Sequence, residues 1–219
     1  MNTLTPLRTT LAVACALTCT TLPVLAQTEA VVVTGSPRAQ RALDVPFAIT
    51  AIDAETLRDA GPMVNLSEAL VRVPGLVVNS RNNYSQDLQM SSRGFGARAA
   101  FGVRGLRLYT DGIPATMPDG QGQVAHFDLA GAQRIEVLRG PFSVLYGNSS
   151  GGVVAVFTQP VKQAQAEVGL DAGSFGLRQA RVGVATPLGQ GFDLRASLSQ
   201  FESDGFRPQS EARRRLANV

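Results

Sequence analysis

One stretch of this chain, from Ile135 to Val154, constrains the fold more than any other. Its sequence, IEVLRGPFSVLYGNSSGGVV, predicts a strand, a tight turn, one helical turn and a glycine-rich return into a second strand. Small or turn-forming residues fill the positions from Gly147 to Gly151. Because glycine permits backbone conformations and close chain approaches that other residues resist, the stretch predicts a compact, enclosed unit.

The first 26 residues have the pattern of a secretory signal peptide. Arg8 is their only charge, and an apolar stretch runs from Leu11 to Leu25. A membrane-spanning helix is the main alternative, but a span needs roughly 20 apolar residues, and threonines and Pro23 interrupt this one. A lipoprotein signal is a weaker alternative, since Cys15 lacks a leucine-rich approach.

Composition limits the classes of function. Both cysteines, Cys15 and Cys19, lie in the segment predicted to be removed, so the mature chain has neither disulfides nor a cysteine-based metal site. The net charge of +3 is mild and scattered, which gives no support to nucleic-acid binding. We interpret the one basic run, Arg213 to Arg215, as a solvated loop.

Residues 27–43 contain a β-branched run that predicts an extended strand, from Glu29 to Thr34. Gly35 to Pro37 end it. A lone short strand is unstable in water and must pair with something. Two readings stay open: an ordinary first strand of the folded domain, or a peptide that adds to the sheet edge of another protein.

Residues 44–160 predict a mixed α+β domain of short elements. Asp53 is expected to cap a helix over 54–59, and Asn65 or Ser67 to start a second helix that reaches Val71. Two long glycine-rich stretches, 93–105 and 113–124, are expected to be functional loops. The candidate strands are Ala48–Ile52, Leu76–Asn79, Leu88–Ser92, Leu106–Thr110, Ile135–Leu138 and Val153–Thr158.

Residues 161–219 change character. Apolar and polar residues alternate over 167–172, 179–184 and 192–199, with turn residues between these segments. Such segments of roughly 10 residues are typical of membrane β-barrel strands, although a soluble meander with one wet face has the same local pattern. Because open strand edges are not tolerated in lipid, we expect the front part of a longer chain or a truncated reading frame.

Enzyme motifs are weak. Residues 94–99, GFGARA, match a dinucleotide-binding pattern formally, but the glycine-rich residues 101–105 follow where a helix is required. His126 is the only histidine, so it forms neither a zinc site nor an obvious catalytic triad. The spacing of Asp111 and Asp119 fits no calcium loop. We therefore expect no enzyme activity, no cofactor and no metal.

The chain resembles the plug end of TonB-dependent outer-membrane receptors. The resemblance is carried by four motifs in the family's order: Ser92-Arg93-Gly94-Phe95, Asp111-Gly112-Ile113-Pro114, Pro118-Asp119-Gly120-Gln121-Gly122 and residues 135–154. It implies an α+β plug domain followed by the first antiparallel strands of an incomplete transmembrane β-barrel. It also implies energy-coupled uptake of a scarce small molecule, such as an iron–siderophore or cobalamin, across the bacterial outer membrane.

The resemblance implies roles for particular residues. The strand Glu29-Ala30-Val31-Val32-Val33-Thr34 would be the TonB box, which the periplasmic protein TonB binds. Arg93 and Arg139 match the two plug arginines that pair with barrel glutamates and lock the plug, and the guanidinium fork suits a carboxylate. The alternative for Arg139 is a local pair with Glu136.

Ligand contact is expected from the plug loops that face outside the cell. Aromatic side chains there offer flat apolar surface, and arginines suit an anionic ligand. The alternative is loop packing against the barrel wall. The candidates are Arg81, Asn82, Tyr84, Gln86, Phe95, Arg98, Phe101, Met117, Asp119 and Gln121.

Three functions are weighed: energy-coupled uptake, signal transduction, and a stand-alone periplasmic binding or adaptor protein. Transducers of this family carry a further domain before the box, whereas here the box-like strand begins close to the predicted cleavage site. The alternating segments after Lys162 argue against the stand-alone adaptor. Uptake is therefore the prediction, and the sequence does not identify the ligand.

Overall fold

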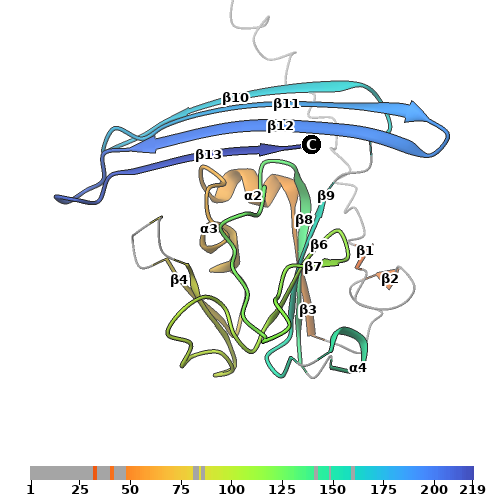
Figure 1. Cartoon of the computed structure of the whole chain (residues 1–219), viewed down its shortest axis with the longest axis vertical. Helices are drawn as coiled ribbons and strands as arrows, with labels where there is room; N and C mark the ends of the chain where they lie inside the picture. Colours follow the sequence, from red (N-terminus) through yellow and green to blue (C-terminus); the bar gives the residue numbers. More distant parts are fainter. Residues whose placement is uncertain are drawn as a thin grey trace, which may run out of the picture. The chain divides into compact units, whose positions relative to one another are not determined.

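The computed structural model describes residues 32–33, 40–41, 48–80, 84, 87–140, 143–147, 149–158 and 161–219. Residues 48–158 form a mixed α+β domain, and a four-stranded antiparallel sheet follows it (Figure 1). We call these parts the mixed domain and the wall sheet. This is the fold class that the sequence predicts. Among the described residues, no helix is long and apolar enough to cross a membrane.

The mixed domain is built on a five-stranded sheet in the order β3-β8-β9-β6-β7. Strands β6 and β9 are parallel and all other pairs are antiparallel. The short strand β7 was not predicted, because it lies in a stretch interpreted as a loop. The strands are β3 (Ala48–Asp53), β8 (Ala132–Arg139), β9 (Val153–Thr158), β6 (Arg107–Thr110) and β7 (Ile113–Pro114).

Strand β8 lies inside the sheet, between β3 and β9, and is covered on both faces. Because side chains alternate along a strand, Ile135 and Val137 enter the large core, while Leu138 packs with Val153 in a smaller cluster on the other face. All four are at most 1% exposed. The two strand ends of the stretch singled out from the sequence are thus buried on both faces of the sheet.

Two helices join the sheet to the next hairpin. Helix α2 (Ala54–Ala60) starts at Asp53, whose Oδ1 accepts a hydrogen bond of 2.8 Å from the N–H of Thr56. Helix α3 spans Ser67–Leu70, so Ser67 rather than Asn65 begins it, and its N-cap residue Leu66 supplies no side-chain bond. In Figure 1 both helices lie between the mixed sheet and the wall sheet.

The remaining elements of the first 160 residues are short. Strands β4 (Leu76–Asn79) and β5 (Gln89–Ser92) form an antiparallel hairpin. Helix α4 (Ser143–Tyr146) is the helical turn predicted within the opening stretch. Strands β1 (Val32–Val33) and β2 (Gln40–Arg41) pair with each other.

The wall sheet has four strands in sequence order, where three were predicted. The missed strand is the last, and it contains Arg213 to Arg215, so interpreting this run as a solvated loop was wrong. The sequence did contain a signal for this strand. A strand with two different faces can alternate between them through charged residues as well as through apolar ones. The strands are β10 (Gln165–Ala172), β11 (Arg178–Gly189), β12 (Phe192–Ser203) and β13 (Ala212–Asn218).

The two faces of the wall sheet differ in chemistry. On β12, Leu194 and Leu198 belong to the face that is turned away from the mixed domain, and Leu198 is 63% exposed. Arg195, Ser197 and Phe201 alternate with them, and Phe201 is 2% exposed. The period-two pattern in the sequence therefore separates an apolar outer face from a largely polar inner face.

The cap of α2 gives a pH-dependent prediction. The hydrogen bond from Thr56 lowers the pKa of Asp53 from its ordinary value of 3.8. Because the folded-state pKa lies below the unfolded one, the stabilisation is present above about pH 4 and is lost as pH falls through the folded-state pKa. Asp53→Ala should cost about 1 kcal/mol of unfolding free energy at pH 7.

Asp53→Asn is the matched control, since asparagine caps equally well but does not titrate here. Acid unfolding followed by circular dichroism should show that Asp53→Asn keeps the stability at pH 7 and loses less of it near pH 3. An identical acid response in wild type and Asp53→Asn would contradict the assignment.

Candidate functional site

An arginine of the wall sheet holds two separate segments of the mixed domain. Arg214, in the middle of β13, donates hydrogen bonds to the main-chain oxygens of Val64, Ala125 and Phe127, the last at 3.2 Å. Val64 lies far from Ala125 and Phe127 in the sequence, so one guanidinium joins both segments to the wall. A hydrogen bond to a charged group contributes about 1.5–3 kcal/mol net.

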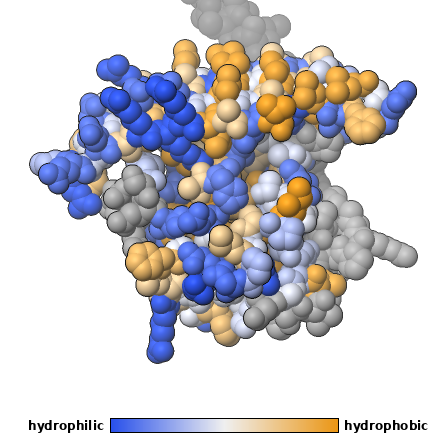
Figure 2. All heavy atoms as spheres, viewed as in Figure 1, coloured by the Kyte–Doolittle hydropathy of each residue, from blue (hydrophilic) through white to orange (hydrophobic). Residues whose placement is uncertain are grey.

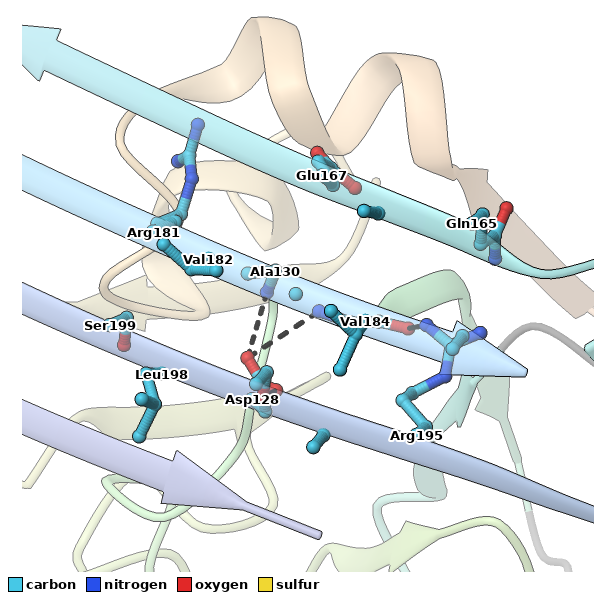
Figure 3. Close-up of a pocket in the computed structure, with 16 residues that line it drawn as sticks. Asp128, Ala130, Gln165, Glu167, Arg181, Val182, Val184, Arg195, Leu198 and Ser199 are labelled. Carbon is cyan, nitrogen blue, oxygen red and sulfur yellow. Dashed lines mark hydrogen bonds between the residues drawn. The ribbon is translucent and has the colours of Figure 1, made fainter.

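A second attachment lies in the groove of Figure 3. The carboxylate of Asp128 accepts hydrogen bonds from the N–H groups of Ala130 and Gly131 at 3.2 and 3.4 Å. The same carboxylate accepts one from the hydroxyl of Ser197 on β12 at 2.6 Å. Arg195, on the same strand, donates to the carbonyl oxygen of Gly131 at 3.4 Å. The turn after Asp128 is therefore bonded to the wall from both sides.

A third arginine completes the series on β11. Arg181 donates to the carbonyl oxygen of Pro62 at 3.4 Å and forms an ion pair with Asp171 of β10 at 3.1 Å. Gly169 leaves the space for this side chain, because a methyl group there would lie 2.7 Å from an Nη atom of Arg181. Three neighbouring strands thus each supply an arginine to main-chain carbonyls of the mixed domain.

The loop that receives two of these arginines is organised from within by Glu68. Its carboxylate accepts hydrogen bonds from the N–H groups of Met63, Val64 and Asn65, at 2.7, 3.2 and 2.9 Å. Burial raises the pKa of Glu68, and these bonds and the nearby charge of Arg214 oppose the rise. Val64 therefore links the two groups, since its N–H faces Glu68 and its carbonyl accepts from Arg214.

The two arginines singled out from the sequence converge on one place. Arg139 ends β8 and donates to the carbonyl of Pro74 and, at 3.0 Å, to the hydroxyl of Thr50. Arg93 follows β5, and its N–H donates to the carbonyl of Gly75 at 3.0 Å. A methyl group at Gly75 would lie 3.9 Å from Arg93 Cγ and 4.0 Å from Arg139 Nη1. The two side chains therefore flank the same glycine.

This arginine pair lacks a counter-charge among the described residues, where neither guanidinium forms an ion pair. The Nε atom of Arg139 is buried without a hydrogen-bond partner. Glu136 does not join them: it faces the opposite side of β8 and pairs with Arg134 at 2.8 Å. The local pair of Arg139 with Glu136, left open by the sequence, is therefore not what the structure contains.

Several of the candidate ligand contacts gather in two loops that are bonded to each other. Val103 and Gly122 exchange two main-chain hydrogen bonds of 2.8 Å, which joins the glycine-rich stretches. Phe101 is 79% exposed and Met117 is 59% exposed. Arg104, which the sequence did not single out, donates to the Gln121 side chain at 3.0 Å and lies 3.6 Å from Asp119.

Two further candidate ligand contacts, Phe95 and Arg98, belong to the first of these stretches, and the rest lie outside both. Phe95 and Arg98 are exposed, and the Cβ of Phe95 lies beside Gly151. The ring of Tyr84 packs against Phe201 of the wall sheet, with centroids 4.9 Å apart. Burial raises the pKa of this tyrosine. Arg81, Asn82 and Gln86 lie outside the described residues.

The predicted TonB-box strand is described only in part. Val32 and Val33 pair with Arg41 and Gln40 through β1 and β2. The other four positions of the strand, which are Glu29, Ala30, Val31 and Thr34, lie outside the described residues, as does the predicted signal peptide.

The structure offers no metal-ligand cluster in the ranges it describes. His126, the only histidine, packs beside Phe127, with ring centroids 4.7 Å apart. Sequence reasoning missed the wall residues Arg181, Arg195 and Arg214 and their partner Asp128 as functional residues. In the period-two pattern of their strands, these arginines occupy positions on the face opposite the exposed apolar residues. That placement was the signal that would have found them.

Comparison with known proteins agrees with this arrangement. Residues 41–154 match the model of the TonB-dependent Receptor Plug Domain. The chain is 32% identical over 212 residues to the vitamin B12 transporter BtuB of Photobacterium profundum. That alignment covers 93% of this chain and 34% of the transporter, so the chain spans about a third of its relative's length.

Two solved structures have a similar fold. The ferric yersiniabactin uptake receptor FyuA from Yersinia pestis matches with a TM-score of 0.53 and 27% identity, over 72% of this chain and 24% of that one. The alcaligin outer membrane receptor FauA from Bordetella pertussis matches with a TM-score of 0.60 and 16% identity, over 83% of this chain and 30% of that one. The second likeness concerns the fold alone.

The carboxylate of Glu68 gives a local prediction. Glu68→Ala removes the acceptor of three N–H groups, and each buried donor left unsatisfied costs about 1–3 kcal/mol. The amides of Met63, Val64 and Asn65 should then exchange with deuterium at least about tenfold faster.

Glu68→Gln keeps one carbonyl oxygen and should give an intermediate rate, while Glu55→Ala, in the first turn of α2, should leave these amides unchanged. Hydrogen exchange followed by mass spectrometry measures all three variants. Unchanged exchange in Glu68→Ala would exclude this role.

Proposed function

Because this chain belongs to the TonB-dependent receptors, we propose that it forms the N-terminal part of a receptor for energy-coupled uptake of a scarce small molecule across the outer membrane. The relatives are transport receptors, and none of the compared names describes an enzyme. The ligand proposed is an iron–siderophore, cobalamin or a molecule of similar size.

In this proposal the chain has four regions, each with its own role. Residues 1–26 are the signal peptide, 27–43 carry the TonB box, 44–160 form the plug, and 161–219 begin the barrel. The match of the plug model to residues 41–154 supports the third region. The alternating faces of β10 to β13 support the fourth.

One observation carries the proposal. The mixed domain is bonded to the inner face of the wall sheet by Arg181, Arg195 and Arg214, while the outer face of that sheet is largely apolar. In a soluble meander, large apolar residues are expected on the face that packs against the domain, and not on the face exposed to water. A plug seated inside a membrane barrel requires this arrangement.

The TonB box works by strand addition in this proposal. The peptide from Glu29 to Thr34 adds to a sheet edge of TonB, so main-chain hydrogen bonds supply the affinity. The pairing of Val32 and Val33 with β2 supports the extended conformation that addition needs. For TonB to take this strand, β1 has to leave β2, and a ladder of two residues on each side offers little resistance.

The plug lock rests on Arg93 and Arg139. The Arg93 side chain passes Gly75 at its Cγ and the Arg139 side chain at an Nη atom, so one anion nearby would be attracted to both positive charges. The unpartnered Nε of Arg139 is a donor that such an anion would satisfy. Carboxylates of the barrel are the proposed partners, since a guanidinium fork binds a carboxylate through two parallel hydrogen bonds.

Ligand contact is proposed for the outward-facing loops. The exposed Phe95, Phe101 and Met117 offer apolar surface, and Arg98 offers positive charge. Arg104 holds Asp119 and Gln121 in place, so these two present a fixed pair of polar groups. The ring of Tyr84 packs against Phe201 of the wall sheet, so in this proposal Tyr84 contacts both the ligand and the wall.

Proline in the box tests the TonB step. Val32→Pro removes a main-chain donor and should abolish energised uptake, while ligand binding to the full receptor stays unchanged. Val32→Thr keeps the donor and the β-branched shape, so it should transport normally. Uptake of a labelled ligand by cells, beside binding to cells without energy, measures both. Normal uptake by Val32→Pro would rule out the box.

Charge reversal tests the lock. Breaking a buried ion pair costs about 3–5 kcal/mol, so Arg139→Glu should loosen the plug and reduce uptake, and Arg139→Lys should have a smaller effect. Assembly is followed by heat-modifiable migration on gels, and plug release by limited proteolysis. The proposal is wrong if Arg139→Glu leaves assembly, protease resistance and uptake intact.

Side-chain truncation tests ligand contact. Arg98→Ala and Tyr84→Ala should each weaken binding, by about 1 kcal/mol or more for a buried contact. A panel of labelled iron chelates and cobalamin identifies the ligand, and equilibrium binding to the purified receptor measures the loss. Arg58→Ala, on the exposed side of α2, should bind normally. Unchanged affinity in both variants would remove these residues from the site.

A further inference from the structure

The outer face of the wall sheet has an apolar band that runs across neighbouring strands. Its members are 39–80% exposed, although they are large and apolar. Figure 2 shows this band in orange along the edge of the molecule formed by the wall sheet. The exposed members on β10, β11 and β12 are Val168, Leu170, Val182, Val184, Leu194 and Leu198.

A cluster of arginines lies at one end of this band, on the same outer face. In the strand register, Glu202 of β12 lies between Arg178 of β11 and Arg213 of β13. Arg215 is the next outward residue of β13, opposite Gln200. The following outward position on β12 is Leu198, so the arginines border the apolar band directly. We call Arg178, Arg213 and Arg215 the outer arginine cluster.

The cluster carries unbalanced positive charge. Arg213 reaches Glu202 at 4.0 Å, and its side chain is 83% exposed. In the part of the chain that the structure describes, Arg178 and Arg215 form no ion pair. Arg214, between two members of the cluster, points inward and bonds the mixed domain. The basic run is therefore divided between the two faces of the sheet.

The connections between strands tell which end of the sheet holds the cluster. Only Gln190 and Gly191 separate β11 from β12. The connections at the opposite end, residues 173–177 and 204–211, are longer. Outer-membrane barrels have short periplasmic turns and longer extracellular loops. Arg178 is the first residue after one longer connection and Arg213 is the second residue after the other, so the cluster lies at the extracellular end of the apolar band.

We propose that the outer arginine cluster binds the phosphate groups of anionic lipid at the outer leaflet of the membrane. This inference rests on the proposed function, because it needs the wall sheet to be part of an outer-membrane barrel. A guanidinium fork binds phosphate oxygens through paired hydrogen bonds. A membrane surface rich in anionic headgroups attracts basic residues that lie next to an apolar span. The outer arginine cluster has this position, because it lies next to the apolar band.

The test uses the full receptor, purified in detergent. Phosphatidylglycerol or phosphatidylcholine with the same acyl chains is added, and retained lipid is counted by native mass spectrometry. Wild type should retain phosphatidylglycerol in preference. Each arginine near an anionic surface contributes about fivefold, so the variant Arg213→Ala with Arg215→Ala should lose about 25-fold of that preference.

Arg58→Ala is the control for lipid retention, because it removes an exposed positive charge from the mixed domain and leaves the wall sheet unchanged. It should retain phosphatidylglycerol like wild type. Equal retention of both lipids by wild type, or an equal loss in Arg58→Ala and the outer double variant, would overturn the proposal. Inorganic phosphate that displaced the lipid at equal concentration would overturn the lipid as the ligand.

Assembly separates the two proposals. If the purified receptor forms a heat-modifiable barrel and takes up ligand, yet shows no preference among lipids, only the lipid site is wrong. If no barrel forms in wild type, the proposed function itself fails.

Discussion

The structure depends on hydrogen bonds that cross from the wall sheet to the backbone of the mixed domain. Arg214 is the clearest case, because it donates to carbonyls in two segments of the domain. A buried main-chain carbonyl without a partner costs free energy, and irregular segments such as 62–65 and 125–131 have few partners of their own. The wall sheet supplies these partners. The mixed domain is therefore attached to the wall through its main-chain carbonyls as well as through its side chains.

Two groups of arginines in this chain have different roles. The inward arginines of the wall sheet, Arg181, Arg195 and Arg214, donate to neutral main-chain carbonyls of the mixed domain. Arg93 and Arg139 lie in the mixed domain, flank Gly75, and have no acid among the described residues. The first group seats the domain on β10 to β13. Arg93 and Arg139 are suited to an acidic partner outside the described residues. Because such an ion pair is charged, breaking it costs more than breaking a hydrogen bond to a neutral carbonyl.

Much of the fold was predictable from local signals. The strands Leu76–Asn79 and Val153–Thr158 and the cap at Asp53 were predicted as they occur, because turn residues and β-branched runs mark them. The fourth wall strand was missed because its alternation runs through arginines, which were interpreted as solvent-exposed. The convergence of Arg93 and Arg139 on Gly75 depends on packing between distant parts of the sequence, and only the family resemblance suggested that the two belong together.

The functional surface was predictable only in part. The sequence pointed to the two glycine-rich loops, and the Val103–Gly122 bonds join them. It gave no sign that Arg104 would hold Asp119, because that contact depends on how the loops fold over each other. Likewise, nothing local distinguishes Asp128 from other loop aspartates, since its partner Ser197 is contributed by a distant strand.

The central claim is that the mixed domain lies against the inner face of the wall sheet, and cysteine cross-linking across Asp128 and Ser197 tests it most directly. In the full receptor, Asp128→Cys with Ser197→Cys should cross-link efficiently, because these side chains are hydrogen-bonded at 2.6 Å. Asp128→Cys with Leu198→Cys should not, since Leu198 faces outward. Equal cross-linking of both pairs, or of the outward pair alone, would contradict the account.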